Sequence, residues 1–280
     1  MGHLIVSEGP STLTLQPAQF ETVRRLIYES IGLDLKPGKE ALVAARLSKR
    51  LRSSGLNSVE ELLEEIQRDT TGERKADLID DLTTNFTAFW REPEHFEFIR
   101  VHVAPVLGRL GSCAVWSAAC ATGEEPYSLL FCLNAALGDK ASRVRIVASD
   151  ISRRALEFAR RGVYPGERLR NLPKEWLPRF FQRGEGAWSG QYRVKPAFRS
   201  RIDFERRNLM DAFDELPACH LILCRNVMIY FDRATQENLV RRLSRRLTPG
   251  GWLLIGHSEG LVGFDHGLRY ISPATYQRPA

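Results

Sequence analysis

The segment Ala118–Gly123 is the first part of the sequence whose residue types suggest ligand binding. It reads Ala-Ala-Cys-Ala-Thr-Gly and joins an apolar, β-prone run to a run with helical spacing. A loop of such small residues lets the backbone approach a ligand closely and leaves N–H groups free at the start of the helix. Asp150 ends the next apolar run, where a carboxylate can accept hydrogen bonds from two ribose hydroxyls. Together, the two features predict a site for a nucleoside cofactor.

The acidic residues after this loop favour a cofactor without phosphate groups. Glu124 and Glu125 stand where a phosphate would meet the start of the helix, and the sequence has no G-x-G-x-x-G to admit a pyrophosphate. Two carboxylates would repel a diphosphate but tolerate a sulfonium cation. S-adenosylmethionine carries that cation and no phosphate, so we expect it as the cofactor and S-adenosylhomocysteine as the product. An ordinary turn followed by helix-start acids would give the same local pattern.

Two further groups of polar residues lie within apolar sequence. They are Asn85, Thr87 and Arg91 in LTTNFTAFWRE, and Arg225, Asn226 and Tyr230 in LILCRNVMIYF. Burying arginine or asparagine without a partner is costly, so such groups are usually paired or serve a ligand. At this point a ligand site and an interdomain hydrogen-bond network explain them equally well.

The composition indicates a globular protein and excludes a disordered or membrane-spanning one. The 280 residues are 43% hydrophobic and 26% charged, and no apolar run approaches the roughly 20 residues of a spanning helix. We therefore expect a soluble, cytoplasmic protein. The five cysteines form no C-x-x-C pair, so we expect core residues and neither a metal site nor a disulfide framework.

Residues 17–80 have the pattern of a small all-helical module. Four segments show helical spacing, and the first two end at Gly32 and Gly55. The apolar positions expected inside these two are Phe20, Val23, Leu26, Ile27 and Ile31, then Leu42, Val43, Ala45, Leu47 and Leu51. Asn57 or Ser58 is a candidate cap for the third helix, and ERKADLIDDLTTNF is the fourth. We expect a first domain over residues 1–81.

Residues 82–280 alternate strand-like and helix-like segments, which predicts a parallel α/β sheet with ligands at the carboxyl ends of its strands. Residues 165–200 interrupt the alternation, and QYRVKPAF within them has the composition of a strand. We interpret this stretch as a small inserted β-subdomain with a glycine loop, RGEGAWSG, at 183–190.

Positive charge is concentrated in two places. Residues 153–207 hold fifteen Lys and Arg against six Asp and Glu, within a net charge of +6 for the whole chain. Arg46, Lys49 and Arg50 follow one another at i, i+3 and i+4, on one helical face. Such charge indicates an acidic partner, which could be nucleic acid, a membrane surface or a protein.

Five segments in order, TTNFTAFWRE, WSAACATGEEPYS, ASDISRRALEFARRGVY, CRNVMIYFD and LTPGGWLLIGHSE, closely resemble the CheR family. These enzymes are the glutamate O-methyltransferases that modify bacterial chemotaxis receptors. The resemblance runs from about residue 17 to the C-terminus. It implies a helical N-terminal receptor-recognition domain, a class I S-adenosylmethionine-dependent methyltransferase domain with a Rossmann-like sheet, and a small inserted β-subdomain.

The resemblance also implies roles for individual residues. The implied cofactor contacts are Asn85, Thr87, Arg91, Glu125, Asp150 at the ribose, Asn208 and Leu209 around the adenine, Arg225 and Asn226. Arg91 and Tyr230 match the positions that orient the substrate and the methyl group. Ala119 stands where many members have glycine and Phe86 where many have glutamate, but alanine still permits close approach of a ligand.

For the partner, the resemblance implies the cytoplasmic methylation helices of a receptor, facing Arg46, Lys49 and Arg50. The loop through Gly184, Gly186 and Gly190 resembles that of members which also dock a pentapeptide at the receptor's C-terminus, where a sheet edge would add the peptide as a strand. We expect a monomer.

A carboxylate substrate is already ionised at neutral pH, so no general base is required and His257 is interpreted as a structural or positioning residue. Nucleic-acid methyltransferases carry an Asn/Asp-Pro-Pro-aromatic motif or a Pro-Cys nucleophile, and neither occurs here. We therefore expect no nucleic-acid substrate. A non-catalytic sensor that binds the cofactor is the alternative of a different class, and intact Arg91, Asp150, Asn208 and Tyr230 argue against it.

Overall fold

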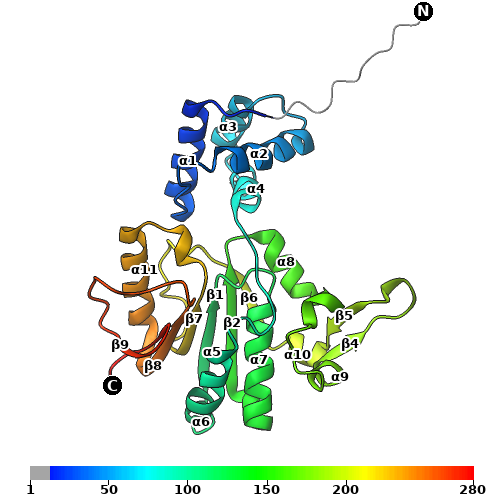
Figure 1. Cartoon of the computed structure of the whole chain (residues 1–280), viewed down its shortest axis with the longest axis vertical. Helices are drawn as coiled ribbons and strands as arrows, with labels where there is room; N and C mark the ends of the chain where they lie inside the picture. Colours follow the sequence, from blue (N-terminus) through cyan, green and yellow to red (C-terminus); the bar gives the residue numbers. More distant parts are fainter. Residues whose placement is uncertain (1–12) are drawn as a thin grey trace, which may run out of the picture. The chain divides into compact units, whose positions relative to one another are not determined.

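The computed structural model describes residues 13–280 and divides the chain into two compact units, Met1–Thr83 and Thr84–Ala280 (Figure 1). The sequence led us to expect the division after residue 81. No helix among the residues described is both long and apolar enough to cross a membrane.

The first unit is helical, as its apolar spacing predicted. Its helices are α1 (Pro17–Ile31), α2 (Glu40–Ser54), α3 (Val59–Arg68) and α4 (Glu73–Leu82). α1 and α2 end where Gly32 and Gly55 take left-handed conformations with φ of 70° and 71°. The Ser58 hydroxyl accepts a hydrogen bond from the Glu61 N–H and caps α3.

The buried face of α2 is rotated slightly about the helix axis relative to the face that we expected from the apolar positions. α2 buries Val43, Ala44, Leu47 and Leu51. Leu42, expected inside, is 48% exposed, and Ala45 is also exposed. Positions spaced by four residues form the buried stripe, and Leu42 lies off this stripe although it is apolar. The fourth helix stops at Leu82 because Thr83 is extended, so the following Thr-Asn-Phe, expected to be helical, is not.

The second unit is built on a seven-stranded sheet in the order β6-β2-β1-β7-β8-β10-β9. Its strands are β1 (Cys113–Ala118), β2 (Val144–Asp150), β6 (Ile202–Arg206), β7 (Cys219–Cys224), β8 (Leu247–Ile255), β9 (Arg269–Ser272) and β10 (Thr275–Gln277). The five strands from β6 to β8 are parallel, whereas β10 pairs antiparallel with β8 and β9. The sheet is therefore mixed. Our prediction of a parallel sheet holds for these five strands and is wrong for β9 and β10.

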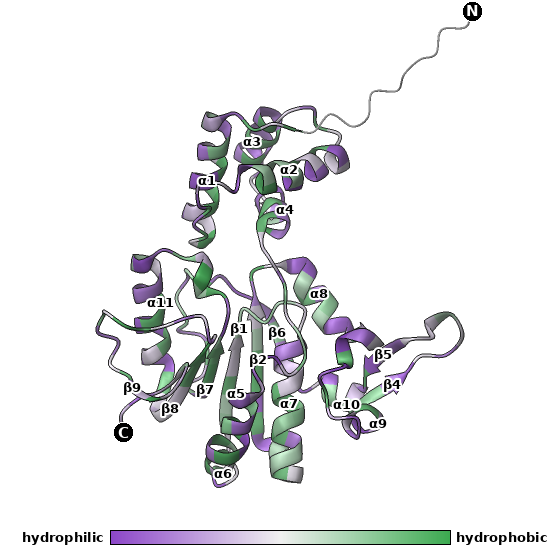
Figure 2. Ribbon diagram, viewed as in Figure 1, coloured by the Kyte–Doolittle hydropathy of each residue, from purple (hydrophilic) through white to green (hydrophobic). Residues whose placement is uncertain are grey.

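Helices cover both faces of this sheet. They are α5 (Pro93–Phe98), η1 (Ile99–Val103), α6 (Ala104–Leu107), α7 (Glu124–Leu137), η2 (Gly138–Arg143), α8 (Arg153–Arg161), η5 (Met228–Tyr230) and α11 (Arg233–Arg246). Side chains of β1 alternate between two cores: Val115 packs with α7, and Trp116 packs with α11. Both faces being buried explains why β1 reads as a continuous apolar run. In Figure 2, α7 is mostly pale green to white, whereas α11, on the other side of the sheet, carries more hydrophilic purple.

A separate three-stranded antiparallel sheet interrupts the alternation. It contains β3 (Val163–Pro165), β4 (Phe181–Arg183) and β5 (Gln191–Val194), in the order β3-β5-β4, with η3 (Gly166–Leu169), α9 (Trp176–Phe180), η4 (Gly186–Trp188) and α10 (Pro196–Arg199). Phe180 stacks on Phe131 of α7 with ring centroids 4.2 Å apart. The strand expected in QYRVKPAF is β5.

Candidate active site

The register of the parallel strands brings the predicted cofactor residues to one edge of the large sheet. Ala118 at the end of β1 pairs with Ser149 of β2 on one side and Cys224 of β7 on the other, and Cys224 pairs with Ile255 of β8. The residues that follow these four positions are the small-residue loop, Asp150, Arg225 and Gly256. The aligned strand ends bring these residues together. Because ligands of open α/β sheets bind at the carboxyl ends of the strands, this is where we expect the cofactor.

The loop between β1 and α7 is sharply turned. Ala119, Ala121 and Gly123 have φ of 60°, 49° and 95°, all in the left-handed region. A β-carbon at Gly123 would lie 2.7 Å from that of Ala159, so only glycine fits there. The sequence predicted free N–H groups in this loop, but the Cys120 N–H already donates to the Ser149 carbonyl (2.9 Å).

Asp150 holds the loop to the neighbouring strand. It is buried, and its Oδ2 accepts a hydrogen bond from the Ala121 N–H at 2.8 Å. Its Oδ1 accepts one from the N–H of Ser152, the residue that caps α8, at 2.9 Å. Asp150 thus ties the small-residue loop to the start of α8, beside the carboxyl ends of β1 and β2.

The two glutamates at the start of α7 are paired with arginines. Arg168 donates to Glu124 at 2.7 Å, and Arg225 donates to Glu125 at 3.1 Å. Burial raises the pKa of both carboxyl groups despite these partners. The expectation that both carboxylates face the ligand and repel a diphosphate therefore needs correction. A phosphate is disfavoured here instead because loop N–H groups that would bind it, those of Cys120 and Ala121, are occupied.

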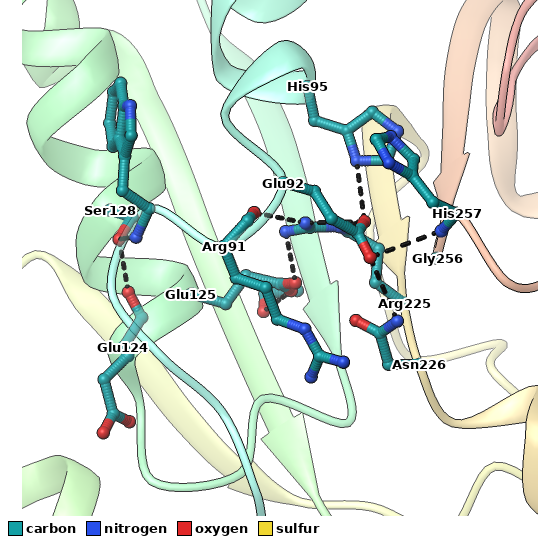
Figure 3. Close-up of polar contacts among 12 residues, drawn as sticks. Arg91, Glu92, His95, Glu124, Glu125, Ser128, Arg225, Asn226, Gly256 and His257 are labelled. Atoms are coloured by element: carbon teal, nitrogen blue, oxygen red, sulfur yellow. Dashed lines mark hydrogen bonds and ion pairs between the residues drawn. The ribbon is translucent and has the colours of Figure 1, made fainter. Parts of the chain in front are cut away.

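Arg225 is the centre of a buried ion-pair network (Figure 3). Only 1% of its side chain is exposed. Its Nη2 donates to Glu92 at 2.8 Å and also to the Arg91 carbonyl, and its Nη1 donates to Glu125. Protein acceptors take up the hydrogen-bond donors of this guanidinium, so a direct contact with a ligand is not favoured. We had predicted a cofactor contact for Arg225, and its geometry is that of a group that positions its neighbours.

Glu92 completes this network and was missed by the sequence reasoning. Its Oε1 accepts hydrogen bonds from the Asn226 side chain (3.1 Å) and the His257 N–H (3.3 Å). Burial alone would raise the pKa of Glu92, but His95 and the Arg225 guanidinium outweigh burial and hold this pKa well below its usual range. The sequence feature that could have pointed to Glu92 is its position as an acidic residue directly after Arg91, in a segment rich in aromatic residues.

Glu92, His95 and His257 also offer three atoms within 4.8 Å of one another that could bind a metal ion. His95 Nδ1 lies 3.4 Å from Glu92 Oε2, and its ring packs edge-on against that of His257. The Arg225 guanidinium already occupies Glu92 Oε2, and its charge would repel a cation bound there. The cluster is thus built as an ion-pair network with neutral imidazole, since burial lowers the pKa of His95.

Arg91 points away from this network (Figure 3). Its Nη1 donates to the Phe86 carbonyl at 3.3 Å, and its guanidinium lies 5.8 Å from the Phe86 ring centroid. Within residues 13–280, no carboxylate forms an ion pair with it. Phe86 is 76% exposed, so this pair lies at the surface of the second unit. Arg91 therefore remains available to an anionic group.

The comparisons with known proteins agree with this geometry. Residues 85–276 match the family model described as "CheR methyltransferase, SAM binding domain", and residues 18–83 match "CheR methyltransferase, all-alpha domain". The chain belongs to the CheR methyltransferase family.

Curated relatives extend the match over almost the whole chain. It is 42% identical to Chemotaxis protein methyltransferase 2 of Pseudomonas aeruginosa, covering 92% of this chain and 91% of that protein. It is 41% identical to the Chemotaxis protein methyltransferase of Klebsiella aerogenes (92% and 89% covered) and 42% identical to that of Escherichia coli (91% and 87% covered). The resemblance to the CheR family seen in the five sequence segments is confirmed, and with it the S-adenosylmethionine-dependent methyltransferase activity.

The remaining residues carried over from CheR enzymes lie around the same edge of the sheet. The Asn85 amide donates to the Ser152 hydroxyl at 3.3 Å, next to Asp150. Asn208 and Leu209 follow β6, the strand beside β2, and the Asn208 side chain accepts from the Met210 N–H at 3.0 Å. Tyr230 is half-buried at the end of η5, just after β7. Thr87 is half-buried between Asn85 and Arg91.

The basic face of α2 differs from the open face that we expected. Arg50 is 13% exposed and forms ion pairs with Asp77 (2.9 Å) and Asp81 of α4. Arg46 donates to the carbonyls of Leu82 and Thr83. Both arginines thus help to hold α4 against α2, whereas Lys49 between them is exposed.

The glycine loop joins β4 to β5 at the edge of the small sheet. Gly186 and Gly190 have φ of 54° and 82°, and a β-carbon at Gly184 would collide with the backbone of Trp188. The loop therefore needs glycine for its own turn. Trp188 at its tip is 64% exposed.

Proposed function

We propose that this chain transfers the methyl group of S-adenosylmethionine to glutamate side chains of chemotaxis receptors, forming methyl esters in the cytoplasm. The observation that carries the proposal is that the acidic side chains at this edge of the sheet are paired with arginines. Glu92, Glu124 and Glu125 are each held by an arginine, so they are not placed to act as a general base. A substrate that needs no base suits this site.

A glutamate carboxylate is such a substrate, because its pKa of about 4.3 leaves it ionised at neutral pH. The bound cofactor supplies the electrophilic methyl group. The task of the protein is then to align the reacting atoms and exclude water. Arg91, which lacks a carboxylate partner among the described residues, would anchor the cofactor's methionine carboxylate. Tyr230 would fix the orientation of the methyl donor, and Asp150 would accept hydrogen bonds from the ribose.

Residues of the loop fit this cofactor. Ala119, Ala121 and Gly123 keep side-chain bulk away from the turn, and the Asp150 carboxylate lies beside it. Asn208 and Leu209 would contact the adenine. In this proposal Glu125, Arg225 and Asn226 support the site mainly through protein contacts, since Arg225 donates to Glu125 and Asn226 donates to Glu92.

Receptor binding would use one contact on each unit. On the helical unit, exposed Lys49 would meet acidic side chains of the methylation helices, with Arg46 and Arg50 contributing through the position of α2. On the second unit, β4 is an edge strand of the small sheet, and it could pair with an extended peptide from the receptor's C-terminus. Calorimetry with a receptor-tail pentapeptide tests the second contact, and an absence of heat would remove it.

The basic middle segment does not favour a nucleic-acid substrate. Arg160 donates to the Phe204 carbonyl at 2.7 Å, Arg199 donates to the Arg161 carbonyl at 3.1 Å, and Arg201 donates to the Ala141 carbonyl. These arginines hold the fold together, so the charge of the segment overstates the positive surface that a phosphate backbone would meet.

The deciding experiment incubates the protein with S-adenosylmethionine labelled in the methyl group and with membranes that contain chemotaxis receptors. We expect label on the receptor that mild base releases, because methyl esters hydrolyse under these conditions. Membranes whose receptors carry glutamine at the accepting positions serve as the control and should take up no label. Base-stable label would indicate N-methylation, and labelled nucleic acid in place of receptor would contradict the proposal outright.

A further inference from the structure

Glu259 makes an unusual set of contacts just beyond the end of β8. It lies in the segment Gly-His-Ser-Glu that follows the strand, and its side chain is half-buried. Each of its carboxylate oxygens accepts two backbone N–H groups. Oε2 accepts from Asn226 (3.0 Å) and Gly256 (2.5 Å), and Oε1 accepts from Met228 (2.7 Å) and Ile229 (3.3 Å).

These four donors come from two separate strand exits. Gly256 directly follows β8, whereas Asn226 follows β7 and Met228 and Ile229 belong to η5, just beyond it. The carboxylate therefore ties the turn after β7 to the end of β8. The turn benefits from such support because Asn226 has φ of 58°, in the left-handed region that asparagine tolerates better than most residues but less readily than glycine. A β-carbon at Gly256 would collide with the Asn226 side chain, so the two exits are also packed closely.

The turn held in this way ends at Tyr230. The Tyr230 N–H donates to the Val227 carbonyl at 3.1 Å, so the orientation of Tyr230 depends on the residues that Glu259 fixes. Glu92 holds the same turn from its other side through the Asn226 amide at 3.1 Å. Two carboxylates thus fix one short segment, one through its side chain and the other through its backbone.

We propose that Glu259 is a positioning residue for methyl transfer, which fixes the Asn226–Tyr230 turn so that Tyr230 is presented to the reacting methyl group. The proposal rests on the role assigned to Tyr230 above. A carboxylate is required because four N–H donors need two acceptor oxygens. Glutamine would place its own NH₂ donor against two of the four, and those two N–H groups would lose their partner.

The test compares Glu259→Gln with Glu97→Gln, which makes the same chemical change at a 59% exposed residue of α5. Hydrogen exchange followed by mass spectrometry reports on the turn itself, in the full-length protein and without any receptor. We expect faster exchange in the peptide spanning residues 226–231 of Glu259→Gln and no change in Glu97→Gln. Unchanged exchange in this peptide would overturn the proposal, whatever the substrate of the enzyme is.

Turnover of receptor methylation then links the turn to catalysis. Two buried N–H donors lose their acceptor in Glu259→Gln, so kcat should fall about ten-fold or more. Binding of S-adenosylhomocysteine, measured by calorimetry, should change much less than kcat. Faster exchange together with unchanged kcat would show that the turn does not position the reaction, and would also overturn the proposal.

A double-mutant cycle with Tyr230→Phe shows whether Glu259 acts through Tyr230. If it does, the double variant should be hardly slower than the slower single variant, because each change disables the same group. Multiplied effects would contradict the proposal. Glu259→Asp keeps the charge on a shorter side chain and should recover part of the turnover. If Tyr230→Phe alone has no effect, the role of Tyr230 fails, while the exchange result still decides whether Glu259 holds the turn.

Discussion

Arg91 and Arg225 lie at the same edge of the sheet, yet their guanidinium groups have different surroundings. Arg225 is enclosed by Glu92, Glu125 and the Arg91 carbonyl, whereas Arg91 contacts the Phe86 backbone and ring. An enclosed charge contributes to stability through its partners, and removing it leaves them buried and unpaired. An accessible charge is available for binding.

The contrast predicts opposite effects of the same substitution. Arg225→Met should lower the free energy of unfolding by about 3–5 kcal/mol, because two buried carboxylates lose their counter-ion. Arg91→Met should leave stability within about 1 kcal/mol of the wild type but weaken S-adenosylhomocysteine binding by roughly ten- to a hundred-fold, as expected for a lost charged hydrogen bond. Chemical denaturation and calorimetry measure the two effects. A stable Arg225→Met variant, or unchanged binding by Arg91→Met, would contradict them.

His95 gives the site a predictable pH dependence. Burial lowers its pKa, so the folded protein resists a proton that the unfolded chain, with an ordinary pKa of about 6.5, accepts. The contribution of His95 to stability therefore falls as pH drops below about 6.5 and should level off below the folded-state pKa. For one proton the slope is at most about 1.4 kcal/mol per pH unit. His95→Phe should flatten this slope between pH 7 and 5 in denaturant titrations, whereas a slope equal to that of the wild type would exclude His95 as its source.

At this scale the sequence indicated which residues gather at the site but not what each one contacts. Asn85 and Arg225, noted as polar groups within apolar sequence, and Asp150, noted as the acid that ends a strand, lie at one sheet edge. Their contacts with a cofactor stay a prediction. Glu92 was missed because its partner Arg225 lies 133 positions further along the chain. No local pattern reports an ion pair of that separation.

Among the elements, α2 shows how a charged helix face can serve the fold. Its arginines contact α4, since Arg50 binds Asp77 and Asp81 and Arg46 binds the carbonyls at the end of that helix. Lys49 is the member of the basic face that stays exposed. The sequence located the face correctly, but spacing alone cannot distinguish a solvated cation from one paired across the helix bundle.

This difference can be measured with two alanine substitutions. Arg50→Ala should destabilise the helical unit by about 1–3 kcal/mol, because it removes hydrogen-bonded ion pairs that are partly buried. Lys49→Ala should change stability by less than about 0.5 kcal/mol and raise the KM for receptor. Thermal unfolding and methylation kinetics provide the two readouts. If Lys49→Ala leaves KM unchanged, this face of α2 does not contact the substrate.

Strands and helices were predictable where burial imposes a strong period. The buried strands β1, β2 and β7 read as apolar runs, and α1 and α2 end at the expected glycines. β9 and β10 were missed because they are too short, at four and three residues, to form a continuous apolar run, and β9 is also largely exposed. The antiparallel edge that they add could therefore not be foreseen.

For the whole molecule, the division into two units has a direct experimental consequence. Both large apolar clusters, with members from Phe89 to Tyr276, lie entirely within residues 84–280. The helical unit buries its own residues, such as Ile27 and Leu47. Each unit thus has the core that a separately folding domain requires.

A chain of residues 84–280 should therefore fold alone and bind S-adenosylhomocysteine with about the affinity of the full-length protein. It should methylate receptors poorly, because the proposed contact through Lys49 is absent. Cooperative unfolding of the shortened chain, calorimetry and label transfer test these points in turn. A shortened chain that folds but does not bind would show that the first unit contributes to the cofactor site.

The site also has a consequence for laboratory evolution. Five non-glycine residues, Trp90, Glu92, Ala119, Ala121 and Asn226, take left-handed backbone conformations in the segments that form it. Each costs on the order of 1 kcal/mol or more, and glycine would remove that cost at the price of a looser backbone. Selection for heat tolerance alone should therefore accept glycine at Ala121 sooner than selection for turnover. Variants recovered in that way would reveal how much rigidity methyl transfer demands from this loop.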